Sequence, residues 1–229
     1  MNKDKLLGRY FSAYLKFSFY ENQLALIEGR NYQLIYAFFD ILCELKTSSS
    51  TTSTSIASSI SLLEKGVESF IACSQQKYIF LKECDQKIDT KDETIIDKFN
   101  EDFSSIFDEF VIVYTQMIKY KDSLLIEELL IEFNNFLSHF IYFIKDNDCS
   151  SGKSHLFRGC LDGYKDIILE NTIVLVSNKD LINRFITLRI DENKDIGKIL
   201  NNNYENILNE YKEIAFKFIT MLNCSVIEK

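Results

Sequence analysis

Four polar side chains between residues 155 and 166 form the combination in this sequence that most resembles an enzyme site. They are His155, Arg158, Asp162 and Asp166. Their spacing of three, four and four residues places them on one face of a helix, and a histidine beside carboxylates suits general acid–base catalysis. The opposite face is apolar and consists of Leu156, Cys160, Tyr164 and Ile167. The polar set is therefore better explained as a solvated helix face in which Arg158 and Asp162 form an ordinary i,i+4 ion pair, and we expect no enzyme.

A second stretch has the look of a nucleotide-binding loop. Residues 147–154 read Asn-Asp-Cys-Ser-Ser-Gly-Lys-Ser, with Asn147 where the first glycine of a phosphate-binding loop belongs. Such a loop lies between a β-strand and a helix. The residues before Asn147 have helical periodicity, so we expect no nucleotide site.

The nearest candidates for zinc ligands are Cys149, His155 and Cys160. Structural zinc takes four ligands, and this spacing is not one that zinc sites use. The E-x-x-H motif of di-iron helical bundles is absent from the chain. We therefore expect no metal and no other cofactor.

The elements that position these side chains are expected to be helices. Apolar residues recur at alternating spacings of four and three through residues 6–45, which is a heptad pattern. Its positions are Leu6, Tyr10, Ala13, Phe17, Tyr20, Leu24, Ile27, Asn31, Leu34, Phe38, Ile41 and Leu45. No proline interrupts it, so it predicts one helix over residues 3–46, about 65 Å long. Asn31 either fixes the register of neighbouring helices or is satisfied locally.

Two polar segments divide the rest of the chain. Residues 47–55 are almost all serine and threonine, and residues 147–153 form a second loop. A polar break at 85–92 ends in a capping box formed by Thr90 and Glu93. No strand-like alternation occurs. We predict an all-α single domain over residues 1–229, with three long kinked helices packed antiparallel as a coiled coil, at about 3–46, 56–146 and 154–224.

Composition limits the partners of the chain. The net charge is −8, and residues 85–148 alone carry fifteen acidic and six basic groups. Nucleic-acid binding needs a basic surface, so we expect none. The six cysteines form no C-x-x-C pair, no run of eighteen apolar residues occurs, and the N-terminus has no signal core. We expect reduced thiols, no transmembrane helix and a cytoplasmic location.

The C-terminal part carries a resemblance to a known family. The relevant stretch is Leu181-Ile182-Asn183-Arg184-Phe185, followed by Arg189, Asp191, Asp195, Leu200, Tyr204, Ile207 and Tyr211. It resembles the last helix of sorting-nexin BAR domains. Residues 20–45, with Arg30 and the Phe38-Phe39 pair, look like the first BAR helix. The resemblance implies a crescent-shaped homodimer, or a heterodimer with a related BAR protein, that binds curved endosomal-type membranes in trafficking.

Two sets of residues follow from this interpretation. The apolar stripe of the first helix is wider than one partner helix needs, so we predict a dimer interface at Leu7, Tyr10, Phe11, Phe17 and Leu24. In a BAR hairpin the loop near residue 150 is an arm tip. The basic residues around it are Lys145, Lys153, Arg158 and Lys165. We predict that they bind anionic, curved membranes weakly.

Two alternatives stay open. The first is a monomeric helical bundle that acts as an adaptor or regulator and binds a protein partner. The second is a small enzyme that uses His155, Arg158 and Asp162.

Overall fold

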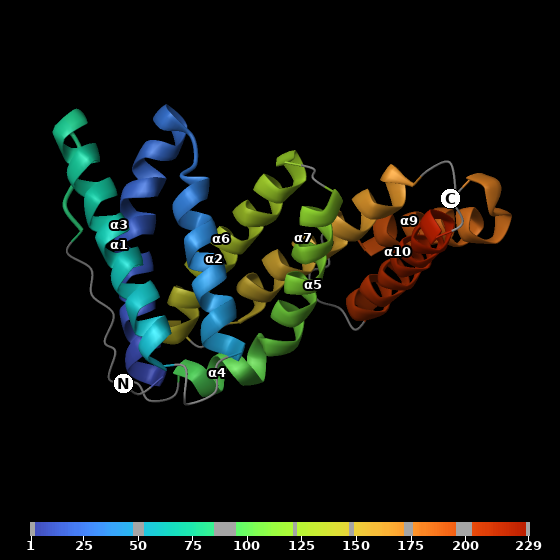
Figure 1. The fold of residues 1–229 in the computed structure, drawn as a ribbon, viewed down its shortest axis with the longest axis horizontal. Helices are drawn as coiled ribbons and strands as arrows, with labels where there is room; N and C mark the ends of the chain where they lie inside the picture. Colours follow the sequence, from blue (N-terminus) through green and yellow to red (C-terminus); the bar gives the residue numbers. More distant parts are fainter. Residues whose placement is uncertain are drawn as a thin grey trace. The chain divides into compact units, whose positions relative to one another are not determined.

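The computed structural model describes residues 3–47, 53–84, 95–120, 123–146, 149–171, 176–195 and 203–227. Every regular element in these ranges is an α-helix, which confirms the predicted all-α class (Figure 1). The helices are α1 (Lys3–Glu28), α2 (Tyr32–Thr47), α3 (Ser53–Lys77), α4 (Ile95–Asp102), α5 (Ser104–Tyr120), α6 (Ser123–Asp146), α7 (Ser150–Glu170), α9 (Lys179–Asp195) and α10 (Asn203–Ile227). None of these described helices combines the length and the apolar character needed to span a bilayer.

The predicted helix over residues 3–46 is wrong, because the chain breaks at Gly29. Gly29 has a φ of 80° and donates its N–H to the carbonyl of Ala25 at 3.1 Å, as a residue that ends a helix does. The side chain of Asn31 then accepts the N–H of Leu34 at 3.1 Å and caps the next helix. Asn31 is thus satisfied locally and does not sit in an interhelical seam.

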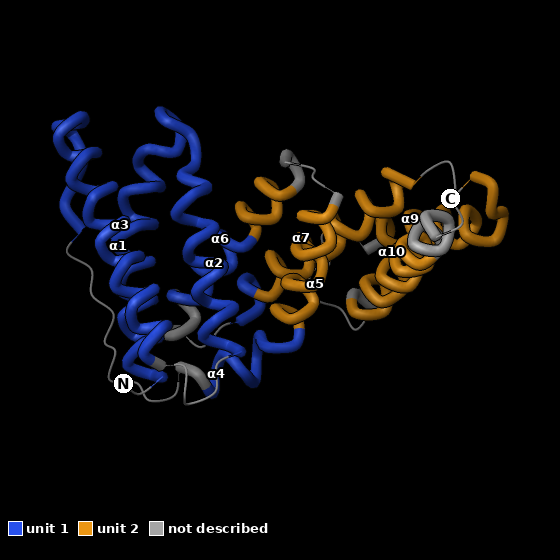
Figure 2. Tube along the Cα trace, viewed as in Figure 1, with its two compact units in different colours: residues 1–105, 133–152 blue, residues 106–132, 153–229 orange. Residues whose placement is uncertain are grey.

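The first compact unit comprises residues 1–105 and 133–152, drawn in blue in Figure 2. In it α1 and α2 both pack against α3. Its core is aromatic and includes Tyr10, Phe11, Tyr14, Phe17, Phe38, Phe103, Phe136 and Phe140. The hydroxyl of Tyr14 donates to the carbonyl of Asn134 at 2.6 Å and so links α1 to the last part of α6.

The second compact unit comprises residues 106–132 and 153–229, drawn in orange in Figure 2. Glu109 on α5 holds two other helices of this unit. Its carboxylate accepts the hydroxyl of Tyr164 on α7, and its other oxygen lies 2.6 Å from Nζ of Lys212 on α10. α10 also packs against α9. The single domain expected over residues 1–229 stays a prediction.

The helices are shorter than the predicted arms. In the second arm, α3 ends at Lys77 and residues 78–84 are not helical. In the third, α7 and α9 are separate helices. The second loop is also shorter than predicted, because α7 begins at Ser150. Three long helices are therefore not confirmed, and the capping box of Thr90 and Glu93 lies outside the described residues.

Candidate functional site

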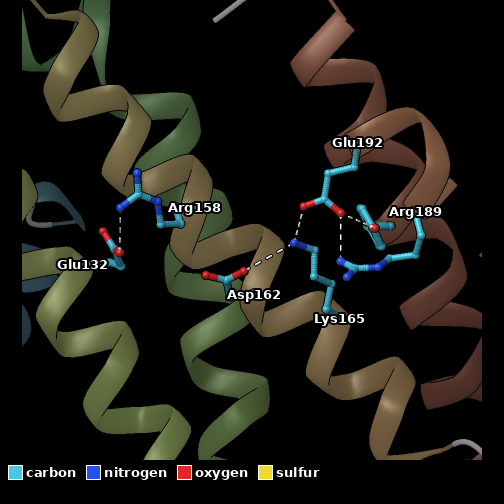
Figure 3. A network of polar contacts seen from close by, with 7 residues as sticks. Glu132, Arg158, Asp162, Lys165, Arg189 and Glu192 are labelled. Atoms are coloured by element: carbon cyan, nitrogen blue, oxygen red, sulfur yellow. Dashed lines mark hydrogen bonds and ion pairs between the residues drawn. The ribbon is translucent and has the colours of Figure 1, made fainter. Parts of the chain in front are cut away.

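The enzyme-like residues of α7 are brought together with a carboxylate that sequence reasoning did not connect to them. Nδ1 of His155 lies 2.6 Å from Oε2 of Glu132 on α6. Nη1 of Arg158 lies 3.4 Å from the other oxygen of the same carboxylate (Figure 3). The sequence predicts an ion pair between Arg158 and Asp162. In the structure Asp162 instead lies 3.4 Å from Nζ of Lys165.

A second carboxylate, Glu192 on α9, collects the donors at the other end of this network. Lys165 donates to one of its oxygens. Its other oxygen lies 3.0 Å from Nη1 of Arg189 and accepts the Tyr211 hydroxyl at 2.7 Å (Figure 3). Burial acts to raise the pKa of Glu192, but the hydrogen bonds from Lys165 and Tyr211 outweigh it and hold that pKa below its usual value. Burial is also the main reason that the pKa of Asp162 is raised.

This network has the properties of a structural contact. Glu132 and Glu192 are paired with basic residues on other helices, Arg158 and Lys165, so they join α6 to α7 and α7 to α9. A pocket beside Glu132 and Asp162 has a volume of about 150 Å³, whereas small-molecule sites typically have roughly 300–1,000 Å³. Among the described residues, no group of three or more His, Cys, Asp or Glu side chains could hold a metal ion.

The four basic residues predicted to touch a membrane differ in their surroundings. Lys165 is only 15% exposed at its side chain and is paired with Glu192. Arg158 is half-exposed and paired with Glu132. Lys153 lies in the first turn of α7 and is half-buried, and the side chain of Lys145 lies outside the described residues. Lys165 therefore has a role inside the protein as the partner of Glu192. Membrane binding by the four basic residues stays a prediction.

The side chains predicted to form a dimer interface are buried within the chain itself. They are Leu7, Tyr10, Phe11, Phe17 and Leu24. Tyr10, for example, is fully buried and donates its hydroxyl to the carbonyl of Phe38 at 2.8 Å. The width of the apolar stripe on α1 is therefore accounted for by α2, α3 and the aromatic core, and it no longer argues for a dimer. Dimerisation itself stays a prediction.

A different surface of the first unit has the exposure expected of an interaction site. We call it the apolar tip, and it consists of Leu26, Ile27, Ile79 and Phe80. Leu26 and Ile79 are 98% and 97% exposed, and Ile27 and Phe80 are 54% and 59% exposed. Exposed apolar side chains that gather on one part of a surface mark interaction sites more often than ones scattered singly.

Three hydrogen bonds bring the two halves of the apolar tip to one end of the unit. Glu28 at the end of α1 accepts the hydroxyl of Tyr78 at 2.8 Å and also the ammonium of Lys77. The backbone N–H of Lys82 donates to the side chain of Gln23 at 3.3 Å. Residues 77–82 are thus tied to the last turns of α1, the turns that also carry Leu26 and Ile27.

A pocket of about 390 Å³ adjoins this end of α1, at the break before α2. Its lining is Glu21, Leu24, Glu28, Gly29, Arg30, Asn31, Tyr32, Gln33 and Phe70. The side chain of Glu21 is 2% exposed, and its Oε2 accepts a hydrogen bond from Nη1 of Arg30 at 2.7 Å. Its Oε1 is buried and has no hydrogen-bond partner among the described residues. Burial raises the pKa of Glu21, although Arg30 opposes that shift.

Sequence reasoning missed both the apolar tip and this pocket. The heptad pattern placed Ile27 in the helical seam, where burial is expected, and the structure leaves it more than half exposed. The one signal for the tip was the run Tyr78-Ile79-Phe80-Leu81, in which four apolar residues follow each other without helical spacing. The pocket had no signal, because it depends on the break at Gly29.

No protein-family model, no curated protein and no solved structure matches this chain. The resemblance to sorting-nexin BAR domains stays a prediction.

Proposed function

We propose that this chain is a non-catalytic helical protein that attaches peripherally to phospholipid membranes by inserting the apolar tip of its first unit. The observation that carries the proposal is the near-complete exposure of Leu26 and Ile79, at 98% and 97%. Side chains that protrude this far can enter a bilayer without any opening of the protein. Complete burial of a Leu, Ile or Phe side chain is favourable by about 1.5–3 kcal/mol of free energy. Insertion of the four side chains of the tip therefore favours binding of the protein to a bilayer.

Charge favours insertion over electrostatic attraction. The protein carries a net charge of −8, which an anionic surface repels over most of its area. At the tip, Lys77 is neutralised by Glu28, and the exposed Lys82 is followed by the exposed Glu83. The contact surface is thus close to neutral and apolar, which suits zwitterionic phospholipid better than the anionic lipid expected from the four basic residues near residue 150.

The resemblance to sorting-nexin BAR domains supports the same class of function. In this proposal the protein acts in membrane trafficking from the cytoplasmic side, on curved, endosomal-type membranes. It does so as a homodimer or as a heterodimer with a related BAR protein. The apolar tip then supplies the membrane contact that the paired residues Arg158 and Lys165 supply poorly.

Co-sedimentation with vesicles of phosphatidylcholine and phosphatidylethanolamine tests the proposal. We expect the wild type to pellet with the vesicles at both low and high salt, because apolar insertion is not screened by ions. The double variant Ile79→Ser/Phe80→Ser should stay mostly in the supernatant. The control variant Leu62→Ser removes another exposed apolar side chain of the same unit and should pellet as the wild type does. Equal pelleting of the tip variant and the wild type contradicts the proposal.

A second candidate function is the binding of a helical protein partner. A groove of about 540 Å³ lies between α2 and α3, and its lining includes Leu34, Ile41, Leu62, Gly66 and Phe70. Leu62 is 69% exposed there, and amphipathic helices commonly bind in such grooves. A binding activity that requires Leu62 and tolerates Ile79→Ser/Phe80→Ser would favour this candidate over membrane attachment.

A further inference from the structure

The pocket at the α1–α2 break combines features that seldom occur together without a ligand. Glu21 lines it and is 98–99% buried, yet only one of its two carboxylate oxygens has a hydrogen-bond partner among the described residues. A buried carboxylate with an unsatisfied oxygen is unfavourable, and a donor at that oxygen would relieve it. The Arg30 side chain beside it is 30% exposed, so a cation stands between the buried carboxylate and solvent.

The rest of the lining suits a small ligand with a positive end. The aromatic residues Phe70 and Tyr32 line the same pocket, and the second carboxylate of the lining, Glu28, is already paired with Lys77. Ammonium groups are attracted both to carboxylates and to the faces of aromatic rings. At the mouth, Gly29 leaves open space, because a Cβ added there would meet no atom within 4 Å. The volume of about 390 Å³ lies within the range of roughly 300–1,000 Å³ that is typical of small-molecule sites.

We propose that this pocket binds the zwitterionic head group of a phospholipid, with the phosphate at Arg30 and the ammonium at Glu21. The inference rests on the proposed membrane function and names the lipid chemistry that it recognises. Binding exchanges one ion pair for two: Arg30 leaves Glu21 and binds the phosphate, and the ligand's ammonium takes the place of the guanidinium. The exchange conserves charge inside the pocket. A primary ammonium, as in ethanolamine, also donates an N–H to the unpartnered Oε1 of Glu21, whereas the trimethylammonium of choline has no N–H to donate.

The position of the pocket agrees with this ligand. Glu28 both lines the pocket and accepts the hydrogen bonds from Lys77 and Tyr78 that hold the apolar tip. Leu26 and Ile27 lie in the same last turns of α1 as the lining residues Leu24 and Glu28. A lipid whose head group enters the pocket therefore has exposed apolar side chains close by for its acyl chains. A net charge of −8 also favours a ligand whose own net charge is zero.

Soluble head groups test the pocket without any membrane. Titration of the full ¹⁵N-labelled protein with phosphoethanolamine should give saturable shifts of the amide signals of Gly29, Arg30 and Asn31. Phosphocholine should bind more weakly, because its ammonium cannot donate to Oε1 of Glu21. Inorganic phosphate alone and ethanolamine alone should bind at least about tenfold more weakly than phosphoethanolamine, because each engages only half of the site. Shifts that map to another part of the chain overturn the proposal, and so does equal affinity for inorganic phosphate alone.

Variants add a second, independent readout. Glu21→Gln keeps the shape of the side chain and should weaken head-group binding at least about tenfold, as should Arg30→Gln. The control Glu64→Gln removes a carboxylate that is also paired with an arginine of α1, Arg9, and should bind as the wild type does. Head-group binding by Glu21→Gln at wild-type affinity overturns the proposal. The Ile79→Ser/Phe80→Ser variant should keep head-group binding while losing vesicle binding, so failure of the pocket and failure of the tip are seen separately.

Discussion

Arg30 and Glu21 form an ion pair across the break between the first two helices, with Nη1 of Arg30 2.7 Å from Oε2 of Glu21. The two residues are nine positions apart in sequence, on either side of Gly29. Their pairing places a cation at the surface and a nearly inaccessible carboxylate behind it. This arrangement has consequences both for stability and for binding.

The first prediction concerns pH. The folded state holds the Glu21 proton at pH values where the unfolded chain has lost it, because burial raises the pKa of Glu21 in spite of Arg30. Stability contributed by this group therefore increases as the pH falls through that window. We expect the free energy of unfolding of the wild type, relative to Glu21→Gln, to rise from about pH 7.5 to about pH 4.5. Urea denaturation at several pH values measures it, and a relative fall over the same range would contradict the prediction.

The second prediction concerns the break itself. Gly29→Ala places a Cβ on a residue with a φ of 80° but into open space, so only the backbone conformation is penalised, by about 1–2 kcal/mol. The matched control is Gly66→Ala in α3, where the new Cβ meets only Leu34 Cδ2 at 3.4 Å. Since alanine favours a helix interior, this control should be neutral or stabilising. Denaturation of both variants tests the pair, and equal destabilisation would show that the position of Gly29 is not special.

The third prediction concerns the link between α1 and α6. The buried Tyr14 hydroxyl lies 2.6 Å from the carbonyl of Asn134, 2.8 Å from Oδ1 of Asn134 and 2.9 Å from Oγ of Ser138. Tyr14→Phe leaves these polar atoms without that partner and should lower the free energy of unfolding by about 1–3 kcal/mol. Tyr20→Phe removes a hydroxyl that accepts one bond from the exposed Gln75 and should have a smaller effect. The prediction fails if the two changes are equivalent.

The fourth prediction concerns the polar network of the second unit. Lys165→Glu places a second carboxylate against the largely buried Glu192 and should destabilise the fold by about 2–4 kcal/mol. Lys194→Glu changes the same charge at a site that is 68% exposed and should have an effect below about 1 kcal/mol. Thermal unfolding followed by circular dichroism distinguishes the two. A harmless Lys165→Glu would mean that Lys165 is available for surface contacts after all.

Much of the helical content could be predicted from the sequence. The heptad positions Tyr10, Phe17 and Phe38 are all buried, as their spacing indicated. The spacing could not tell one helix from two, because a heptad pattern continues across a short break when both helices face the same core. The local signals were Gly29 and Asn31, which together match a helix stop followed by a helix cap.

The candidate site could not be predicted in the same way. The pairing of His155 and Arg158 with Glu132 joins residues more than twenty positions apart and depends on how α6 and α7 pack. The exposure of Ile79 and Phe80 depends on α3 ending at Lys77, which no strong stop signal marks. An apolar residue is usually buried. An apolar surface with a function is an exception to this tendency, and only the packing of the helices reveals it.

The most direct test of membrane attachment through the apolar tip uses a tryptophan reporter, since the chain has no tryptophan of its own. Phe80→Trp places one in the tip, and Leu62→Trp places one at an exposed apolar position outside it. With zwitterionic vesicles, the emission of Phe80→Trp should shift to shorter wavelength and be quenched by lipids brominated on their acyl chains, while that of Leu62→Trp stays unchanged. An unshifted and unquenched Phe80→Trp, or identical behaviour of the two variants, would contradict insertion of the tip.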